Sequence, residues 1–243
     1  MKTILSILTV IFTVVSASAQ TILIDFGGGA NPTASPDANS NYWNNLVAPS
    51  NGTATLVSTT NATTGISVAV TDAFDNSGPS PYATLTGNAS LGDLNIGTAI
   101  SDYFYVTSSS IGNLTFSGLN ATKTYTFTIF GTRNATETRT TSYSLIGGNS
   151  GNASLVVSGT NLGGAGINYN TGNLAVISSI SPNGSNEILL TVSTASAFGY
   201  ISALQIDVVP EPSVAVLVLG GMGALLVWRR SRHRARGGGH RAT

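Results

Sequence analysis

The acidic side chains of residues 20–209 are the groups best placed to do chemistry, because this segment contains neither histidine nor cysteine. Serine–histidine and cysteine–histidine catalysis and histidine-ligated zinc are therefore excluded there. A glycosidase needs only two carboxyl groups, about 5–10 Å apart across a cleft. No signature singles out such a pair among the nine carboxylates, which are Asp25, Asp37, Asp72, Asp75, Asp93, Asp102, Glu137, Glu187 and Asp207. We expect no catalytic residue and no enzyme, and keep a carboxylate-based polysaccharide-active enzyme as an alternative.

Two of these carboxylates stand close together in a turn-like stretch. Asp72 and Asp75 belong to the stretch Asp72–Gly78, which is rich in oxygen-bearing side chains. Ca²⁺ accepts carboxylate and carbonyl oxygens as ligands, so a structural Ca²⁺ at Asp72 and Asp75 is one interpretation. The stretch lacks the spacing of an EF-hand loop, and solvated turn carboxylates are the favoured alternative. We expect no other metal or cofactor.

The side chains that favour ligand binding surround Trp43, the only tryptophan of residues 20–209. Tyr42, Trp43 and Asn44 lie in the polar stretch Asn41–Asn45. An aromatic face beside amide groups suits a sugar, which it binds by stacking and directional hydrogen bonds. The same tryptophan can instead fill the end of a hydrophobic core, and that alternative is favoured. Further aromatic candidates are Tyr82, Tyr103 and Tyr105.

The elements that position these residues are predicted to be β-strands. Thr124–Ile129 alternates threonine with aromatic and aliphatic residues, the period of a strand with one buried face. Other predicted strands or strand faces are Thr21–Phe26, Thr53–Ser58, Ile66–Ala73, Leu114–Ser117, Tyr143 with Leu145, Ser154–Val157, Leu174–Ile177, Ile188 to Val192, and Leu204 to Val208. Glycine, asparagine and serine turns separate them. About nine short strands predict an all-β fold, an antiparallel β-sandwich of two sheets, with a short helix at Ala99–Tyr105.

Residues 20–209 are acidic although the whole chain is neutral. They contain nine acidic residues and only three basic ones, Lys123, Arg133 and Arg139, for a net charge of −6. Nucleic-acid binding needs a concentrated basic surface. We therefore expect no nucleic-acid partner.

The first nineteen residues have the pattern of a signal peptide. A positive start at Lys2 precedes the apolar run Ile4–Val15, and Ala17 and Ala19 form a small-residue cleavage site before Gln20. We expect export by the Sec machinery, cleavage by signal peptidase and an exported domain that spans residues 20–208.

The end of the chain combines an apolar stretch with a basic cluster. Residues 214–228 are apolar and span about 22 Å as a helix at ~1.5 Å per residue. A transmembrane helix usually needs about 20 residues, so this one is short. The cluster Arg229, Arg230, Arg232, Arg234 and Arg236 follows, then a tail at 237–243. Arginine-rich flanks stay on the cytoplasmic side, which places the bulk of the chain outside.

The residues before the apolar stretch complete a known arrangement. Val209, Pro210, Glu211, Pro212 and Ser213, then a short apolar helix and an arginine cluster, resemble the PEP-CTERM sorting signal of bacterial surface proteins across residues 209–236. The resemblance implies recognition by an exosortase-like membrane peptidase. It also implies a precursor anchored in the inner membrane, and a mature form at the cell surface or in the extracellular matrix.

Parts of the domain resemble galactose-binding-like jelly rolls, which include malectin-like and carbohydrate-binding modules. The resembling segments are Asp25–Gly27, Leu114–Leu119, Tyr125–Gly131 and Phe198–Ile206. The piece from Gly118 to Tyr125 is also similar to a fibronectin type III strand pair. The jelly-roll resemblance implies a structural, adhesive or carbohydrate-binding role, with exopolysaccharide as a partner. A permanently anchored single-pass membrane protein is the alternative fate.

Overall fold

The computed structural model describes residues 20–27, 29, 31–79 and 88–210. The chain divides into two compact units, Met1–Val209 and Pro210–Thr243, and the architecture below belongs to the first. The predicted signal peptide, the motif residues 211–213, the apolar stretch 214–228 and the arginine cluster lie outside the described residues and stay predictions. Within the described ranges, no helix is long and apolar enough to cross a membrane.

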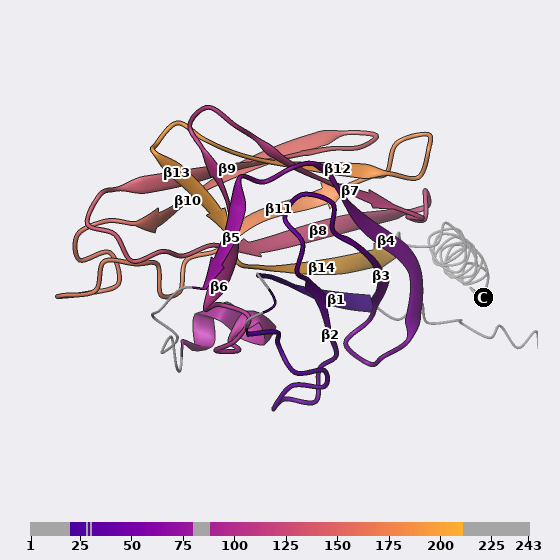
Figure 1. Cartoon of the computed structure of the whole chain (residues 1–243). Helices are drawn as coiled ribbons and strands as arrows, with labels where there is room; N and C mark the ends of the chain where they lie inside the picture. Colours follow the sequence, from indigo (N-terminus) through magenta and orange to yellow (C-terminus); the bar gives the residue numbers. More distant parts are fainter. Residues whose placement is uncertain (1–19, 28, 30, 80–87, 211–243) are drawn as a thin grey trace, which may run out of the picture. The chain divides into compact units, whose positions relative to one another are not determined.

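Strands are the main regular elements of the described part of the chain (Figure 1). Along the chain these are β1 (Gln20–Phe26), β2 (Trp43–Leu46), β3 (Thr53–Val57), β4 (Thr63–Asp72), β5 (Asn76–Pro79), β6 (Asp102–Thr107), β7 (Gly112–Ser117), β8 (Lys123–Phe130), β9 (Arg139–Ile146), β10 (Ser150–Ser158), β11 (Ala175–Ile180), β12 (Ile188–Thr194), β13 (Phe198–Ile201) and β14 (Ala203–Pro210). A 3₁₀ helix, η1 (Ala89–Leu94), precedes β6.

Two large sheets form the predicted sandwich. One has the strand order β11-β8-β14-β1-β2 and the other the order β10-β9-β12-β7-β4-β3. A third, smaller sheet has the order β13-β6-β5 and was not predicted. The prediction of an antiparallel sandwich is confirmed in its main feature. One pair differs, because β1 and β2 run parallel.

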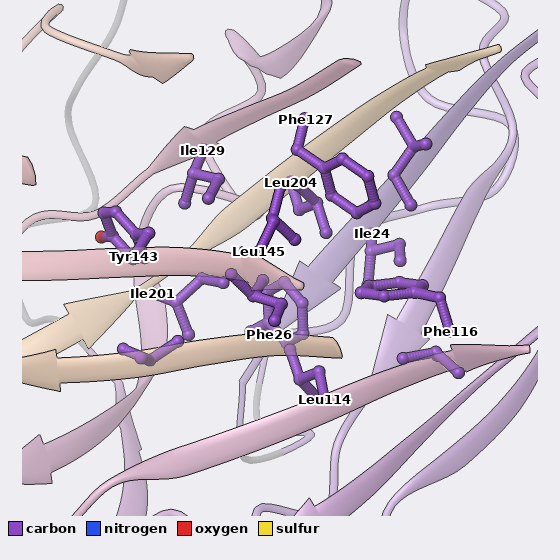
Figure 2. Close-up of a cluster of buried hydrophobic side chains, with 14 of the residues drawn as sticks. Ile24, Phe26, Leu114, Phe116, Phe127, Ile129, Tyr143, Leu145, Ile201 and Leu204 are labelled. Carbon is purple, nitrogen blue, oxygen red and sulfur yellow. The ribbon is translucent and has the colours of Figure 1, made fainter. Parts of the chain in front are cut away.

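The main core lies between the two large sheets, where the alternating side chains of both meet (Figure 2). Tyr125, Phe127 and Ile129 of β8 point inward, and the threonines between them are half-buried. This alternation is typical of a strand that packs on one face only. Phe127 meets Phe116 of β7 edge to face, with 5.4 Å between ring centroids.

Strand β1 is buried on both faces, which explains its nearly continuous apolar sequence. Ile22, Ile24 and Phe26 belong to the main core. Leu23 points the other way, into a second cluster that contains Trp43 and the apolar side chains of the η1 region. That second cluster covers the outer face of the β1–β2 edge, so the tryptophan is part of a core.

The turn between β7 and β8 explains the sequence pattern that stood out between Gly118 and Tyr125. Gly118 has φ +74°, and a Cβ there would lie 2.2 Å from the carbonyl oxygen of Gly65, so only glycine fits without a shift. The backbone N–H of Asn120 donates to Tyr125 Oη at 2.7 Å. This contact ties the turn to the next strand, as the tyrosine corner does in other sandwiches.

The short helix predicted at Ala99–Tyr105 is wrong. Residues 102–107 form strand β6, and the helical turn lies earlier, in η1, where Asn88 Oδ1 accepts a hydrogen bond from Ser90 N. The pattern misled because β6 has aromatic side chains on both faces: Phe104 on one, and Tyr103 and Tyr105 on the other, all in or against the main core. Aromatic residues favour strands, but two apolar faces remove the alternation that identifies one.

Candidate functional site

Trp43 lies in the core, so the interpretation as an exposed sugar-stacking platform has to be corrected. Its side chain is 3% exposed in β2, and Nε1 donates to Asp37 Oδ2 at 2.8 Å. The indole has a satisfied polar end and an apolar body packed against Leu23 and Leu94. A ring with this burial has no face for a ligand, and the core alternative is the one that the structure selects.

The side-chain amide of Asn44, the next residue, is likewise hydrogen-bonded within the fold. Its Nδ2 donates to the carbonyl oxygens of Leu23 and Val57, each at 2.9 Å, and its Oδ1 accepts from Val57 N at 2.8 Å. The side chain therefore bridges β1 to β3 across β2. Tyr42 is half-buried, and its backbone N–H donates to Thr59 O at 3.0 Å.

The two carboxylates of the calcium interpretation do not converge with a third. Asp75 Oδ2 accepts from Thr107 N at 2.7 Å and from Ser110 Oγ, and the Ser110 hydroxyl holds the pKa of Asp75 below its usual value. Asp75 thus closes the turn between β6 and β7. Asp72 is exposed at the end of β4. In the described ranges, no group of three or more acidic or histidine side chains is placed to hold a metal ion.

The two ends of the predicted exported domain lie side by side. Gln20, the predicted mature N-terminus, pairs with Val208 in the antiparallel ladder of β1 and β14. Val209 is 44% exposed, and Pro210 is the last residue of β14. The sorting motif therefore begins where the last strand ends.

Four aromatic rings from two strands gather on one face of the three-stranded sheet. Tyr103 and Tyr105 come from β6, and Phe198 and Tyr200 from β13, in the register Tyr200 opposite Tyr105. Ring centroids are 4.9 Å apart for Tyr103 and Tyr200, and 5.8 Å apart for Tyr105 and Phe198. Tyr103 and Tyr200 are buried, whereas Tyr105 and Phe198 are half-buried at the border of the cluster.

Two arginines lie against these rings. The guanidinium carbon of Arg139 is 4.8 Å from the ring centroid of Phe198, and that of Arg133 is 5.5 Å from the centroid of Tyr103. Arg139 also donates through Nη1 to Tyr200 Oη. We call the set Tyr103, Tyr105, Arg133, Arg139, Phe198 and Tyr200 the aromatic–arginine face.

The positive charges of both arginines act on the two buried phenols of this face. Burial raises the pKa values of Tyr103 and Tyr200, and the positive charges of Arg133 and Arg139 partly offset that rise in each. The two guanidinium groups are therefore close enough to act on the same pair of rings. Cation–π contacts of this kind hold a guanidinium in place while leaving hydrogen-bond donors at its edge.

A second concentration of polar groups is the buried pair of Asp25, at the end of β1, and Asp102, at the start of β6. Both residues are 2% exposed, and the Oδ1 atom of each has no hydrogen-bond partner. Asp25 Oδ2 accepts from Thr33 N at 2.9 Å. Gly27 makes room for the pair, since a Cβ there would lie 1.7 Å from Asp102 Oδ2.

Burial and the proximity of the two carboxyl groups favour a pair that shares one proton over a pair with two charges. Burial raises the pKa of Asp25 to about 6. Burial, and then the negative charge of Asp25, raise the pKa of Asp102 to about 8. The two carboxyl groups interact directly with each other inside the fold, whereas a glycosidase pair stands about 5–10 Å apart across an open cleft. This pair therefore lacks the glycosidase geometry.

The residues of the aromatic–arginine face were only partly found from the sequence. Tyr103 and Tyr105 were candidates, Tyr82 lies outside the described residues, and Phe198 and Tyr200 were missed as ligand-binding residues. The spacing of two in both aromatic pairs was the available signal, because it puts each pair on one face of a strand.

Lys123, the third basic residue, lies elsewhere. It borders an open cleft of about 350 Å³ whose other lining residues are Gln20, Thr21, Ser58, Thr59, Thr60 and Ala62. Polar side chains dominate this lining, and it includes no aromatic ring. Since Lys123 and Phe130 are the two ends of β8, the cleft and the loop that follows β8 are separated by the length of that strand.

The sequence matches no protein-family model and no curated protein. Among solved structures, the ANX2 ectodomain from Arabidopsis thaliana is similar at 13% identity and a TM-score of 0.47, over 79% of this chain and 50% of that one. The CBM22-1–GH10 modules of xylanase 10B from Clostridium thermocellum, in complex with xylohexaose, are similar at 16% identity and a TM-score of 0.29. This match covers 50% of this chain and 23% of that one. TmCBM61 in complex with β-1,4-galactotriose is similar at 13% identity and a TM-score of 0.26, over 54% of this chain and 86% of that one.

This chain thus spans half the length of the ANX2 ectodomain chain and less of the xylanase chain. The three similarities are too low to transfer a ligand or an activity. An interpretation of this β-sandwich therefore depends on its own side chains.

Proposed function

We propose that residues 20–208 form a jelly-roll-like carbohydrate-binding domain that acts outside the cell, with the aromatic–arginine face as its binding site. The observation that carries this proposal is the half-buried pair Tyr105 and Phe198 beside two guanidinium groups. Aromatic rings stack on the C–H faces of sugars, and guanidinium groups donate hydrogen bonds to sugar oxygens. The two kinds of group lie on one sheet face here.

The face is also held rigidly, which favours binding. Tyr103 and Tyr200 pack into the main core beneath the half-buried rings, and Tyr200 N donates to Thr141 Oγ1 at 2.8 Å. A site whose groups are already ordered loses little conformational entropy when the ligand arrives. The four rings and Arg139 come from paired strands, so this part of the face is a preformed surface, to which the loop after β8 adds Arg133.

Replacing Phe198 by alanine is expected to lower the affinity for a bound glycan about three- to tenfold, because a stacked ring contributes about 0.5–1.5 kcal/mol beyond the area it buries. Isothermal titration with the polysaccharide that the wild-type protein binds measures this. Phe198→Tyr keeps the ring and should keep most of the affinity. Ile146→Ala, at a residue 52% exposed on β9, removes apolar surface elsewhere and should change nothing. Equal affinity for wild type and Phe198→Ala would exclude this face as the site.

We further propose that the chain is exported through the Sec pathway and sorted by its PEP-CTERM-like segment. The order of Pro210, Glu211 and Pro212, the apolar stretch 214–228 and the arginine cluster supports this. An exosortase-like membrane peptidase then processes the region of the motif, and the domain reaches the cell surface or the exopolysaccharide matrix. The motif starts at the end of β14, so cleavage there leaves the strand pairing of the domain intact.

Peptide mapping of the mature protein from its native host is expected to show a chain that begins at Gln20 and that lacks every peptide after the motif. Mass spectrometry of both termini provides the measurement. Recovery of intact 214–230 peptides from the mature protein would show instead a permanently anchored single-pass protein.

A further inference from the structure

We propose that the glycan bound by the aromatic–arginine face is anionic, a polysaccharide with carboxylate or sulfate groups, and that Arg133 and Arg139 bind its charge. This inference rests on the proposed carbohydrate-binding function and names the class of sugar. It starts from the distribution of charge. Residues 20–209 carry nine acidic side chains and three basic ones, and two of those three lie on this one face.

The two guanidinium groups act together. Both influence the phenol of Tyr103 and the phenol of Tyr200, so the positive charges converge on one pair of rings. Like charges repel each other, and placing two of them together on an acidic domain has a cost that a bound anion removes. A neutral sugar would gain hydrogen bonds from either arginine but would not offset that repulsion.

Neither arginine is neutralised by a strong internal partner. The ion pair of Arg139 is with Glu137, at 3.4 Å, and the side chain of Glu137 is 70% exposed, so solvent weakens it. Arg139 Nε is buried without a hydrogen-bond partner. In the described residues, no carboxylate lies within ion-pair distance of Arg133. The charge of Arg133 is therefore left available to a ligand, and the charge of Arg139, whose side chain is 15% exposed, is only weakly balanced by Glu137.

The rings and the guanidinium groups are close enough to bind a single ligand that both stacks and carries a negative charge. Arg139 lies over Phe198 and reaches Tyr200, which fixes its planar group beside the half-buried rings. A sugar ring that stacks there brings a carboxylate or sulfate substituent within reach of a guanidinium edge. Guanidinium groups bind such oxygens with paired, charge-assisted hydrogen bonds. An anionic sugar uses both the stacking and the charge of the face.

The test compares glycans that differ only in charge. Binding of the full chain is measured by isothermal titration and affinity electrophoresis to polygalacturonate and its methyl ester, and to dextran sulfate and dextran. The variants are Arg133→Gln and, as a matched control, Lys123→Gln, which removes one positive charge from the cleft at the start of β8. Melting temperatures equal to wild type show that both variants fold.

The expected result is a preference of about tenfold or more for a charged member over its neutral partner, since charge-assisted hydrogen bonds are the stronger class. Arg133→Gln should remove most of that preference, and Lys123→Gln should leave it unchanged. Which pair shows it distinguishes carboxylate from sulfate. Equal binding of charged and neutral partners overturns the inference but leaves the proposed function intact. Equal losses in the two variants overturn the assignment to this face, and no binding to any of the four overturns both proposals.

Discussion

Replacing Asp102 by asparagine is expected to make the domain more stable than wild type at pH 8 and to flatten the dependence of its stability on pH. In the wild type, the pKa values of Asp25 and Asp102 lie at about 6 and about 8, above the ordinary value of 3.8. The folded state therefore holds protons that the unfolded state has released. The contribution of this pair to the free energy of unfolding is fully present below about pH 4 and falls as pH rises toward 8, by about 1.4 kcal/mol per pH unit for each proton held.

The physical reason is that, among the residues that the structure describes, no cationic side chain acts on the pair to balance a second charge. The causes that shift these two pKa values are burial, the hydrogen bonds from Thr33 and the interaction between the two carboxyl groups. An asparagine at 102 keeps the size of the side chain and removes the charge, so Asp25 can ionise without a charged neighbour. At pH 4 the variant gains no such advantage, because the wild-type pair is then protonated.

Chemical denaturation at pH 4, 6 and 8 measures the effect. Asp93→Asn, at an exposed residue of η1, removes the same charge from the surface and should retain the wild-type slope. A wild-type protein whose stability does not decline between pH 5 and pH 8 would contradict the shared proton. So would an Asp102→Asn variant that is less stable than wild type at pH 8.

Replacing Trp43 by alanine is expected to cost about 3–5 kcal/mol of folding stability, the usual loss for a large aromatic side chain deleted from a core. The side chain is 3% exposed and packs in the second cluster, and the variant also loses the 2.8 Å hydrogen bond to Asp37. Glycan affinity of the protein that remains folded should be unchanged. Thermal and chemical denaturation measure the first effect, and titration below the unfolding transition measures the second.

Phe198→Ala is the matched comparison, because it truncates an aromatic ring that is only half-buried. It should lose affinity with a smaller loss of stability. The opposite pair of results, with Trp43→Ala stable but unable to bind, would restore Trp43 as a ligand-binding residue and remove the aromatic–arginine face from that role.

The sandwich could be predicted because most strands bury one face. Alternation in β8 and β12 is a local property of the sequence, and it survives into the structure since threonine and apolar residues point to opposite sides. Strand β6 escaped prediction because it carries aromatic side chains on both faces, Phe104 on one and Tyr103 and Tyr105 on the other. The parallel pairing of β1 with β2 is set by tertiary packing and has no local signal.

The site was harder to predict because its residues meet only through the topology. Tyr105 and Phe198 come from strands far apart in the sequence that pair in the third sheet, and Arg133 lies in the loop that follows β8. The Asp25–Asp102 pair has the same origin. Trp43 had two interpretations from the sequence, a ligand-binding ring and a core residue, and its burial agrees with the favoured core interpretation. Its polar neighbours Asn44 and Asp37 use their polar atoms inside the fold.

The most direct test of the proposed binding site is a nuclear magnetic resonance titration that follows the ring signals of the aromatic residues while an oligosaccharide of the preferred glycan is added. The account predicts that the signals of Tyr105 and Phe198 shift in proportion to binding and that those of the buried Trp43 stay in place. Shifts at Trp43, or in the cleft lined by Lys123, with Tyr105 and Phe198 unchanged, would contradict it.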